Sequence, residues 1–223
     1  WDKKKMKVRS SDPNFEDKLY FRDGKHFILG SLQVVTLNLP QAAYESEKDI
    51  DKFIEYNRES IKMAIEIFKI KIKLMNNQAL SFQIQTPIDL NDKTKDAPAL
   101  WDIKEIPCCI GVVGLNEAIQ YITGNQIHED INSYNIAKDL LTRLQYVISE
   151  EAFGLDFKIA FARTPAETTA QRFAVCDLFN TKYADKAINV IKGDIQNAIE
   201  NNEKSNDLPV YYTNGAMISN DAD

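Results

Sequence analysis

The segment FILGSLQVVTLNLP, residues 27–40, sets the fold class of this 223-residue chain. It is rich in β-branched and apolar residues, Gly30 is an expected bend, and Pro40 follows its last apolar residue. A short apolar run bounded by Gly and Pro is typical of a buried strand. We therefore predict a buried strand over Phe27–Leu39.

A helical pattern follows this strand directly. From Gln41 to about Met75, apolar residues recur at spacings of three, four and seven. The residues in phase are Ile50, Phe53, Ile54, Ile61, Ala64, Ile65 and Phe68. Such spacing places them on one face, so it predicts a single long amphipathic helix.

The order of strand and then helix repeats along the chain. Further strands are expected at Ile106–Leu115, Phe157–Ala162 and Val210–Thr213, with a short one around 81–85. Helices are expected at 116–122, 130–153, 164–179 and within 182–200. This alternation predicts an α/β fold with mostly parallel strands over residues 27–214, between a polar lead-in (1–26) and a polar tail (215–223).

The composition is that of an ordinary globular protein and argues against several partners. Hydrophobic residues make up 44% and charged residues 27%. The net charge of −6 and a pI near 5.1 argue against a general nucleic-acid binder, which usually has a basic surface. No secretory signal is visible, and no apolar run reaches the roughly 20 residues of a membrane span. We expect a cytoplasmic protein with neither nucleic-acid nor membrane partners.

The familiar signatures of metal and nucleotide sites are missing. His26 and His128 are far apart and no CxxC pair occurs, so no metal site is expected in this chain. No Walker A, GxGxxG or GxSxG motif occurs either. Cys108 and Cys109 would point to opposite faces of a strand, and we interpret both, like Cys176, as small buried hydrophobic residues.

Polar residues gather at the predicted carboxyl ends of the strands, where parallel α/β folds bind their ligands. They share small hydroxyls, amides and carboxylates, which suit a ribose or a phosphate. The candidates are Thr36, Asn38, Asn116, Glu117, Arg163, Thr164, Glu167, Thr213, Asn214 and Gly215.

Each candidate group also has a purely structural interpretation. Thr164 and Glu167 have the spacing of a capping box at a helix start. Asn38 could simply end a strand before Pro40, and the Thr-Asn-Gly triplet at 213–215 could be only a turn.

Four segments occur together in an order known from one enzyme family. They are QVVTLNLPQAAY (33–44), GVVGLNEAI (111–119), FARTPAETTAQRFAVCDL (161–178) and LPVYYTN (208–214). Through them the chain resembles the anaerobic, glycyl-radical ribonucleoside-triphosphate reductases over about Gly30–Asn214. The resemblance implies a ten-stranded α/β barrel of two parallel half-sheets, of which this chain would form an incomplete, central part.

The resemblance also implies radical chemistry that supplies deoxyribonucleotides for DNA replication. In that family a glycyl radical, made by an iron–sulfur activase with S-adenosylmethionine, passes to a cysteine inside the barrel. The resulting thiyl radical removes a hydrogen from the ribose of a ribonucleoside triphosphate, and formate is commonly the reductant. A four-cysteine zinc site supports the radical loop, and an N-terminal module binds ATP; we expect no cofactor on this chain itself.

Some residues carry over from the family motifs. Asn38 of TLNLP matches a polar position close to the substrate ribose and is the expected catalytic residue. Thr213 and Asn214 match the strand end whose following turn cradles the phosphates. The remaining expected substrate-wall residues are Thr36, Asn116, Glu117, Thr164, Glu167 and Gly215. Gly215 departs from the family, which usually has a polar residue there.

The radical residues of the family are not found in this sequence. Residues 1–37 contain no cysteine, and neither a radical-glycine loop nor a four-cysteine site follows YYTN. We therefore expect a fragment or split subunit that needs chains carrying the missing barrel segments, besides the activase, and that self-associates as a homo-oligomer. Two alternatives stay open: a non-catalytic nucleotide-binding or scaffold relative, and a different half-barrel enzyme with Cys108 or Cys109 as nucleophile.

Overall fold

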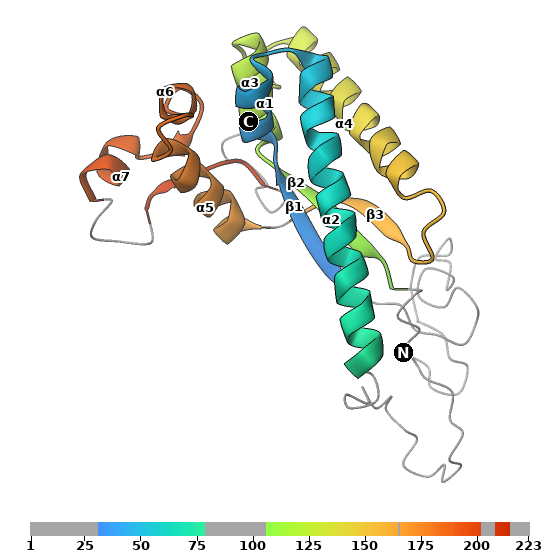
Figure 1. The fold of residues 1–223 in the computed structure, drawn as a ribbon. Coiled ribbons are helices and arrows are strands. Elements are labelled where there is room, and N and C mark those ends of the chain that lie inside the picture. The colour runs from blue at the N-terminus through green and yellow to red at the C-terminus, as the bar shows by residue number, and fades with distance from the viewer. Residues whose placement is uncertain (1–30, 79–105, 165, 202–207, 215–223) are drawn as a thin grey trace, which may run out of the picture.

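A three-stranded parallel sheet forms the centre of the molecule (Figure 1). The computed structural model describes residues 31–78, 106–164, 166–201 and 208–214. The strands β1 (Gln33–Asn38), β2 (Cys108–Val113) and β3 (Ile159–Arg163) lie side by side in chain order. Helices connect each strand to the next, so the predicted alternation and the α/β class are confirmed.

The main core lies between the sheet and two helices that pack against each other, α2 (Ile50–Gln78) and α4 (Ile131–Glu151). Alternate strand residues such as Leu37, Cys108 and Ile110 point into it. The predicted apolar face of α4 is confirmed, since Leu140 and Leu144 are fully buried. Residues on the opposite face of the sheet, such as Val34 and Cys109, are exposed or half-buried.

The predicted single helix from Gln41 to Met75 is wrong. The chain forms α1 (Leu39–Ser46) and then α2. Glu47 and Lys48 between them have positive φ angles of 51° and 71°, which a right-handed helix does not tolerate. Asp49 then starts α2 by accepting hydrogen bonds from the N–H groups of residues 51 and 52 at 2.9 and 3.0 Å.

The strand predicted up to Leu39 ends one residue earlier, at Asn38. Leu39 and Pro40 already belong to α1, because a proline fits the first turn of a helix, where its missing N–H has no partner to lose. After β2, the predicted short helix is confirmed as α3 (Leu115–Thr123). The expectations for 1–26, 81–85 and 215–223 lie outside the described residues.

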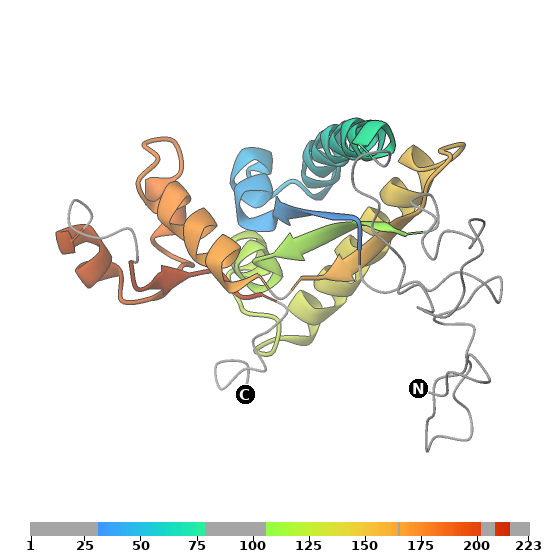
Figure 2. The same ribbon diagram turned by 90° about the horizontal axis from the view of Figure 1, so that it is seen from below.

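The C-terminal part lies beyond the carboxyl ends of the parallel strands, as both views show (Figure 2). Its elements are α5 (Glu167–Leu178), α6 (Ala184–Ala187), β4 (Lys192–Gly193), α7 (Ile195–Asn201) and β5 (Val210–Tyr211). They pack with the end of β2 and with α1 around a second core that includes Tyr44, Val113, Ala174 and Tyr212. None of the described helices has the length and apolarity to cross a membrane.

The last predicted strand does not join the parallel sheet. β5 pairs antiparallel with β4, and this pairing also interrupts the helix expected within 182–200. Gly193 makes the pairing possible for two reasons. A Cβ at this position would lie 2.1 Å from the carbonyl oxygen of Pro209, and the φ angle of Gly193 is +100°, which favours glycine. The close approach of the two backbones therefore requires a glycine.

Candidate functional site at the strand ends

The extended segment Tyr212–Asn214 lies against the carboxyl ends of the parallel strands. The N–H of Gly114, just after β2, donates to the carbonyl of Thr213 at 2.8 Å, and the N–H of Tyr212 donates to Ala170 at 3.3 Å. Neighbouring side chains of an extended segment point to opposite sides. Tyr212 and Thr213 accordingly contact two different groups of residues, described in turn below.

Asp177 is the centre of the first group. Its Oδ2 accepts hydrogen bonds from the side-chain amide of Asn38 at 2.9 Å and from the hydroxyl of Tyr212 at 3.0 Å. Its Oδ1 accepts from the amide of Gln41 at 3.4 Å, and the hydroxyls of Tyr212 and Tyr44 lie 3.1 Å apart. The carboxylate, contributed by α5, thus ties the end of β1 to the segment after β5.

Asp177 is only 1% exposed. Burial raises its pKa, and the hydrogen bonds from Asn38 and Tyr212 lower it by less. No lysine, arginine or histidine of the described ranges forms an ion pair with it. A buried carboxylate without a cation depends on neutral hydrogen-bond donors. For Asp177 these donors are Asn38, Gln41 and Tyr212.

Glu117 is the centre of the second group. It is fully buried on α3, and its Oε2 accepts from the hydroxyl of Thr213 at 2.8 Å and from the N–H of Thr213 at 3.1 Å. Its Oε1 has no hydrogen-bond partner in the described part of the chain. Burial raises the pKa of Glu117 against the smaller opposing effects of Thr213 and of Lys192.

Thr164 lies just after β3, above Gly111 of β2. Its Oγ1 is buried without a partner among the described residues, and a Cβ on Gly111 would lie 1.7 Å from it. Helix α5 starts at Glu167 after Ala166, without a side-chain cap. The capping-box interpretation of Thr164 and Glu167 is therefore wrong, and the Thr164 hydroxyl lies against the sheet instead.

The other predicted site residues are placed differently. Thr36 lies on the same face of β1 as Asn38 and is level with Gly111. Asn116 is turned toward the loop after α3: its amide nitrogen donates to Gln126 at 2.9 Å, and its oxygen accepts from the N–H of residue 127 at 3.0 Å. Glu167 is exposed, and Gly215 lies outside the described residues.

Two hollows border the strand-end residues. One of about 230 Å³ combines apolar walls with the polar side chains of Thr213 and Asn214; its lining is Val112, Gly114, Leu115, Leu141, Phe161, Ala162, Thr213 and Asn214. Another of about 370 Å³ is lined by Glu167, Thr168, Gln171, Leu208, Pro209, Val210, Tyr211 and Asn214. Several elements converge on each, as is typical of ligand sites.

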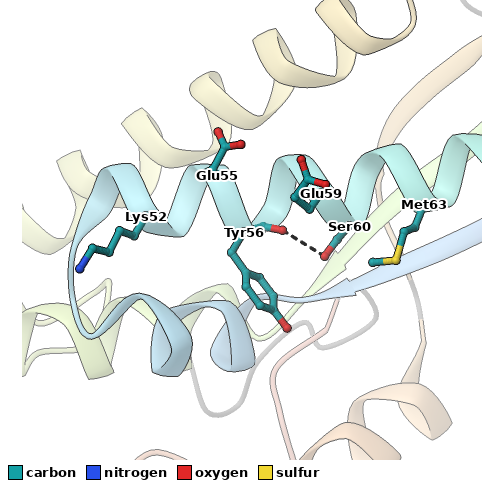
Figure 3. A pocket seen from close by; sticks show the side chains of 6 residues that line it. All are labelled: Lys52, Glu55, Tyr56, Glu59, Ser60 and Met63. Carbon is teal, nitrogen blue, oxygen red and sulfur yellow. Dashed lines mark hydrogen bonds between the residues drawn. The ribbon is translucent and has the colours of Figure 1, made fainter.

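A further hollow of about 360 Å³ lies on the surface of α2 (Figure 3). All six lining residues belong to that one helix; they are Lys52, Glu55, Tyr56, Glu59, Ser60 and Met63. Tyr56 points toward α1, whereas Glu55 and Glu59 point away from it. Because no second element contributes a polar group, this hollow is a poor candidate for a specific site.

Sequence reasoning missed Asp177 and the two buried tyrosines, Tyr44 and Tyr212. A signal for Asp177 was present: Ala170, Ala174 and Asp177 are spaced by four and three, and all are buried. An acidic residue in phase with the buried face of a helix indicates a special role, since carboxylates are almost never buried without partners.

Comparison with known proteins decides the family. The model of the anaerobic ribonucleoside-triphosphate reductase family matches residues 5–223. This chain belongs to that family. The four segments that carried the resemblance all lie within this match; they are residues 33–44, 111–119, 161–178 and 208–214. A search of curated proteins found no match.

Solved anaerobic ribonucleotide reductases share the fold. One matches with 21% identity and a TM-score of 0.56, covering 70% of this chain and 25% of its own. The Thermotoga maritima enzyme with citrate in the active site matches with 20% identity and a TM-score of 0.56, covering 70% and 28%. The same enzyme in complex with dATP and CTP matches with 20% identity and a TM-score of 0.55, covering 70% and 26%. The chain thus spans about a quarter of the length of these reductases.

The described residues do not fit the zinc site of the reductase family. No group of three or more His, Cys, Asp or Glu side chains in the described ranges could hold a metal ion. Burial raises the pKa of the Cys108 thiol to about 11, so it stays protonated at neutral pH. That protonation argues against a nucleophilic Cys108.

Proposed function

We propose that this chain supplies part of the substrate-binding barrel of an anaerobic ribonucleoside-triphosphate reductase. Such an oxidoreductase reduces ribonucleoside triphosphates to 2'-deoxyribonucleotides by radical chemistry. One observation carries the proposal: Asp177 ties the end of β1, and Glu117 the first turn of α3, to the segment Tyr212–Asn214. Three stretches far apart in sequence thereby present their polar groups at one end of the sheet, where α/β folds bind ligands.

The proposed roles follow from where the groups lie. Asn38 contacts the ribose and is the residue closest to the reaction. Asn214 and the amide of Gly215 bind the phosphates, near the start of α3, whose partial positive charge favours anions. Thr213 holds this turn in place, because its hydroxyl and its N–H both donate to Glu117. The rest of the proposed substrate wall is formed by Thr36, Glu117, Thr164 and Glu167; Asn116, whose amide is bonded to the loop after α3, is left out of it.

The proposed partners complete the barrel. A complementary chain or the remaining part of the enzyme would bring the radical-bearing segments and the zinc site, and an activase would generate the radical. We propose a cytoplasmic homo-oligomer that acts in deoxyribonucleotide synthesis for DNA replication. This chain holds no cofactor in the proposal; its residues bind and orient the substrate.

Calorimetric titration with a ribonucleoside triphosphate tests the binding half of the proposal. We expect heat of binding with the chain and a clear loss with Thr213→Val, because the valine has no hydroxyl to donate to Glu117 and the segment that ends at Asn214 is no longer held in place. Ser149→Ala, on the exposed face of α4, is the matched control and should bind as before. Absence of heat with the unchanged chain would argue against this function and against a nucleotide-binding relative alike.

Activity of the complete enzyme tests the catalytic half. Asn38→Ala should lower kcat by about 100-fold, the size typical of losing one aligned donor at the reacting group. An unchanged kcat would show that Asn38 has no role in the reaction. Triphosphate binding without turnover in the completed enzyme would favour the non-catalytic relative.

A further inference from the structure

We infer that Asp177 is the positioning residue for Asn38, and that it decides which end of the Asn38 amide faces the substrate. The inference rests on the proposed function, because it concerns the residue proposed to contact the ribose. Asp177 lies on α5, 139 positions along the chain from Asn38, and the hydrogen bond between them measures 2.9 Å. Nothing in the local sequence around Asn38 supplies this contact.

The two ends of the Asn38 amide have different partners. Its Oδ1 accepts from the N–H of Gln41 at 3.4 Å, in the first turn of α1, while its Nδ2 donates to Asp177. An amide turned by 180° has almost the same shape. Turned here, its oxygen would face the Asp177 carboxylate and its nitrogen would face the N–H of Gln41. Two acceptors would then face each other at one end and two donors at the other. Only the observed orientation therefore makes both hydrogen bonds.

This orientation fixes what Asn38 can offer to a ligand. One N–H of Nδ2 is used by Asp177, and no described residue other than Asp177 accepts a hydrogen bond from Nδ2. Asn38 is only half-buried, so the second N–H is available at the end of β1. A hydroxyl oxygen of a ribose can accept this hydrogen bond. The inverted amide would present an acceptor there instead and would select a different substrate group.

Asp177 is held firmly enough to impose the orientation. Its Oδ2 also accepts from Tyr212 at 3.0 Å, and Tyr212 is fully buried against Tyr44, with their hydroxyls 3.1 Å apart. Its Oδ1 accepts from the side-chain amide of Gln41 at 3.4 Å. The donors Gln41 and Tyr212 come from two different parts of the chain, α1 and the segment after β5. A carboxylate held from several sides does not move to follow Asn38; the amide follows the carboxylate.

A double-mutant cycle in the complete enzyme tests the inference. Asn38→Ala and Asp177→Ala should each lower kcat by about 100-fold, with KM for the ribonucleoside triphosphate changed less than about 3-fold. The double variant should be no slower than the single variants, because both changes remove the same interaction. The inference would be overturned if the fold-losses in kcat of the two single variants multiplied in the double variant. A raised KM with unchanged kcat for Asp177→Ala would overturn it as well.

Two gentler variants keep the test decisive if Asp177→Ala does not fold. Asp177→Asn keeps an oxygen for Asn38 and Tyr212 and should retain kcat to within about 10-fold. Tyr212→Phe removes one donor to Asp177 and should lower kcat several-fold, but only while Asn38 is present. An equal effect of Tyr212→Phe in the Asn38→Ala background would contradict the inference.

The outcomes separate this inference from the proposed function. If Asn38→Ala alone leaves kcat unchanged, the assignment of Asn38 to the reaction fails, whatever Asp177 does. If Asn38→Ala lowers kcat and the effect of Asp177→Ala is independent of it, only the positioning role fails. Thermal unfolding of every variant shows whether a loss of activity follows from a loss of folded protein.

Discussion

At the scale of single residues, the strand ends are organised by two buried carboxylates. Asp177 and Glu117 are 1% and 0% exposed, and neither forms an ion pair within the described ranges. Burying a charge without a cation is unfavourable, and hydroxyl and amide donors offset that cost only in part. Replacement by apolar residues would serve stability better, so the carboxylates are best explained by what they position.

The pH dependence of stability should reveal the buried Glu117. Its pKa in the folded chain lies above the ordinary 4.5, because burial disfavours the charged form. The folded state therefore binds the proton more tightly than the unfolded state. The resulting stability is fully present below pH 4.5 and is lost as the pH rises through the raised pKa.

Glu117→Gln removes this titration. The free energy of unfolding of the unchanged chain, relative to Glu117→Gln, should fall as the pH rises above 4.5. Urea unfolding at several pH values between about 4 and 8 measures it. Glu66→Gln, at an exposed position of α2, is the control for the loss of one negative charge. A difference that does not vary with pH would contradict the buried position of Glu117.

Gly111 should resist any side chain. Gly111→Ala places a Cβ 1.7 Å from the hydroxyl of Thr164, so the neighbouring chain must shift. Overpacking of this kind costs about 1–3 kcal/mol of unfolding free energy. Adding Thr164→Ala removes the clashing hydroxyl and should recover part of the loss in urea unfolding. An additive double variant would mean that the two residues do not touch.

At the scale of elements, the break between α1 and α2 directs the chain into the site. The spacing of the apolar residues shows no interruption between α1 and α2. Positive φ angles at Glu47 and Lys48 end α1 and separate its direction from that of α2. α1 can then pack on α3 with Tyr44 inside the second core, beside Tyr212. The cost of two residues in an unfavourable conformation is offset by this packing.

Glu47→Gly tests the break. Glycine adopts positive φ without steric strain, so the variant should gain up to about 1 kcal/mol of unfolding free energy. Lys71→Gly in the exposed interior of α2 is the control and should lose about 1 kcal/mol. Thermal or urea unfolding compares the two. If Glu47→Gly destabilised as much as the control, the helix would be continuous.

At the scale of the whole molecule, partly exposed residues on one face of the sheet, such as Val34 and Cys109, and an apolar stripe on α2 leave surface for other chains. Met63, Ile67, Ile70 and Leu74 are 48–62% exposed and follow one another at spacings of four, three and four. This spacing aligns them along one side of the helix, away from the buried face. Contiguous apolar surface of this kind is typical of an interaction surface.

We expect the chain alone to self-associate through this apolar stripe. Replacing Ile67 and Ile70 by Glu should lower the associated mass in light scattering without lowering the thermal midpoint, because both side chains are exposed. Lys71→Glu with Lys73→Glu is the matched control, since it adds more negative charge but leaves the apolar stripe intact. A monodisperse monomer of the unchanged chain would contradict the expectation.

The sequence by itself determined the α/β class, the parallel strands and most helix positions. These depend on local periodicity and on Gly and Pro, which a single segment carries. It also determined the family, through the residues around Asn38, Glu117, Thr164 and Thr213. The helix break at Glu47 escaped it, because two strained residues leave no mark on the apolar spacing.

Only the tertiary structure decided how the site is assembled. It paired β5 with β4 instead of with the parallel sheet, turned Asn116 away from the strand ends and brought Glu117 to Thr213. It also placed Asp177 beside Asn38, although 139 positions separate them in the chain. The physical reason is that hydrogen bonds between distant segments depend on how whole elements pack, and no local pattern encodes that packing.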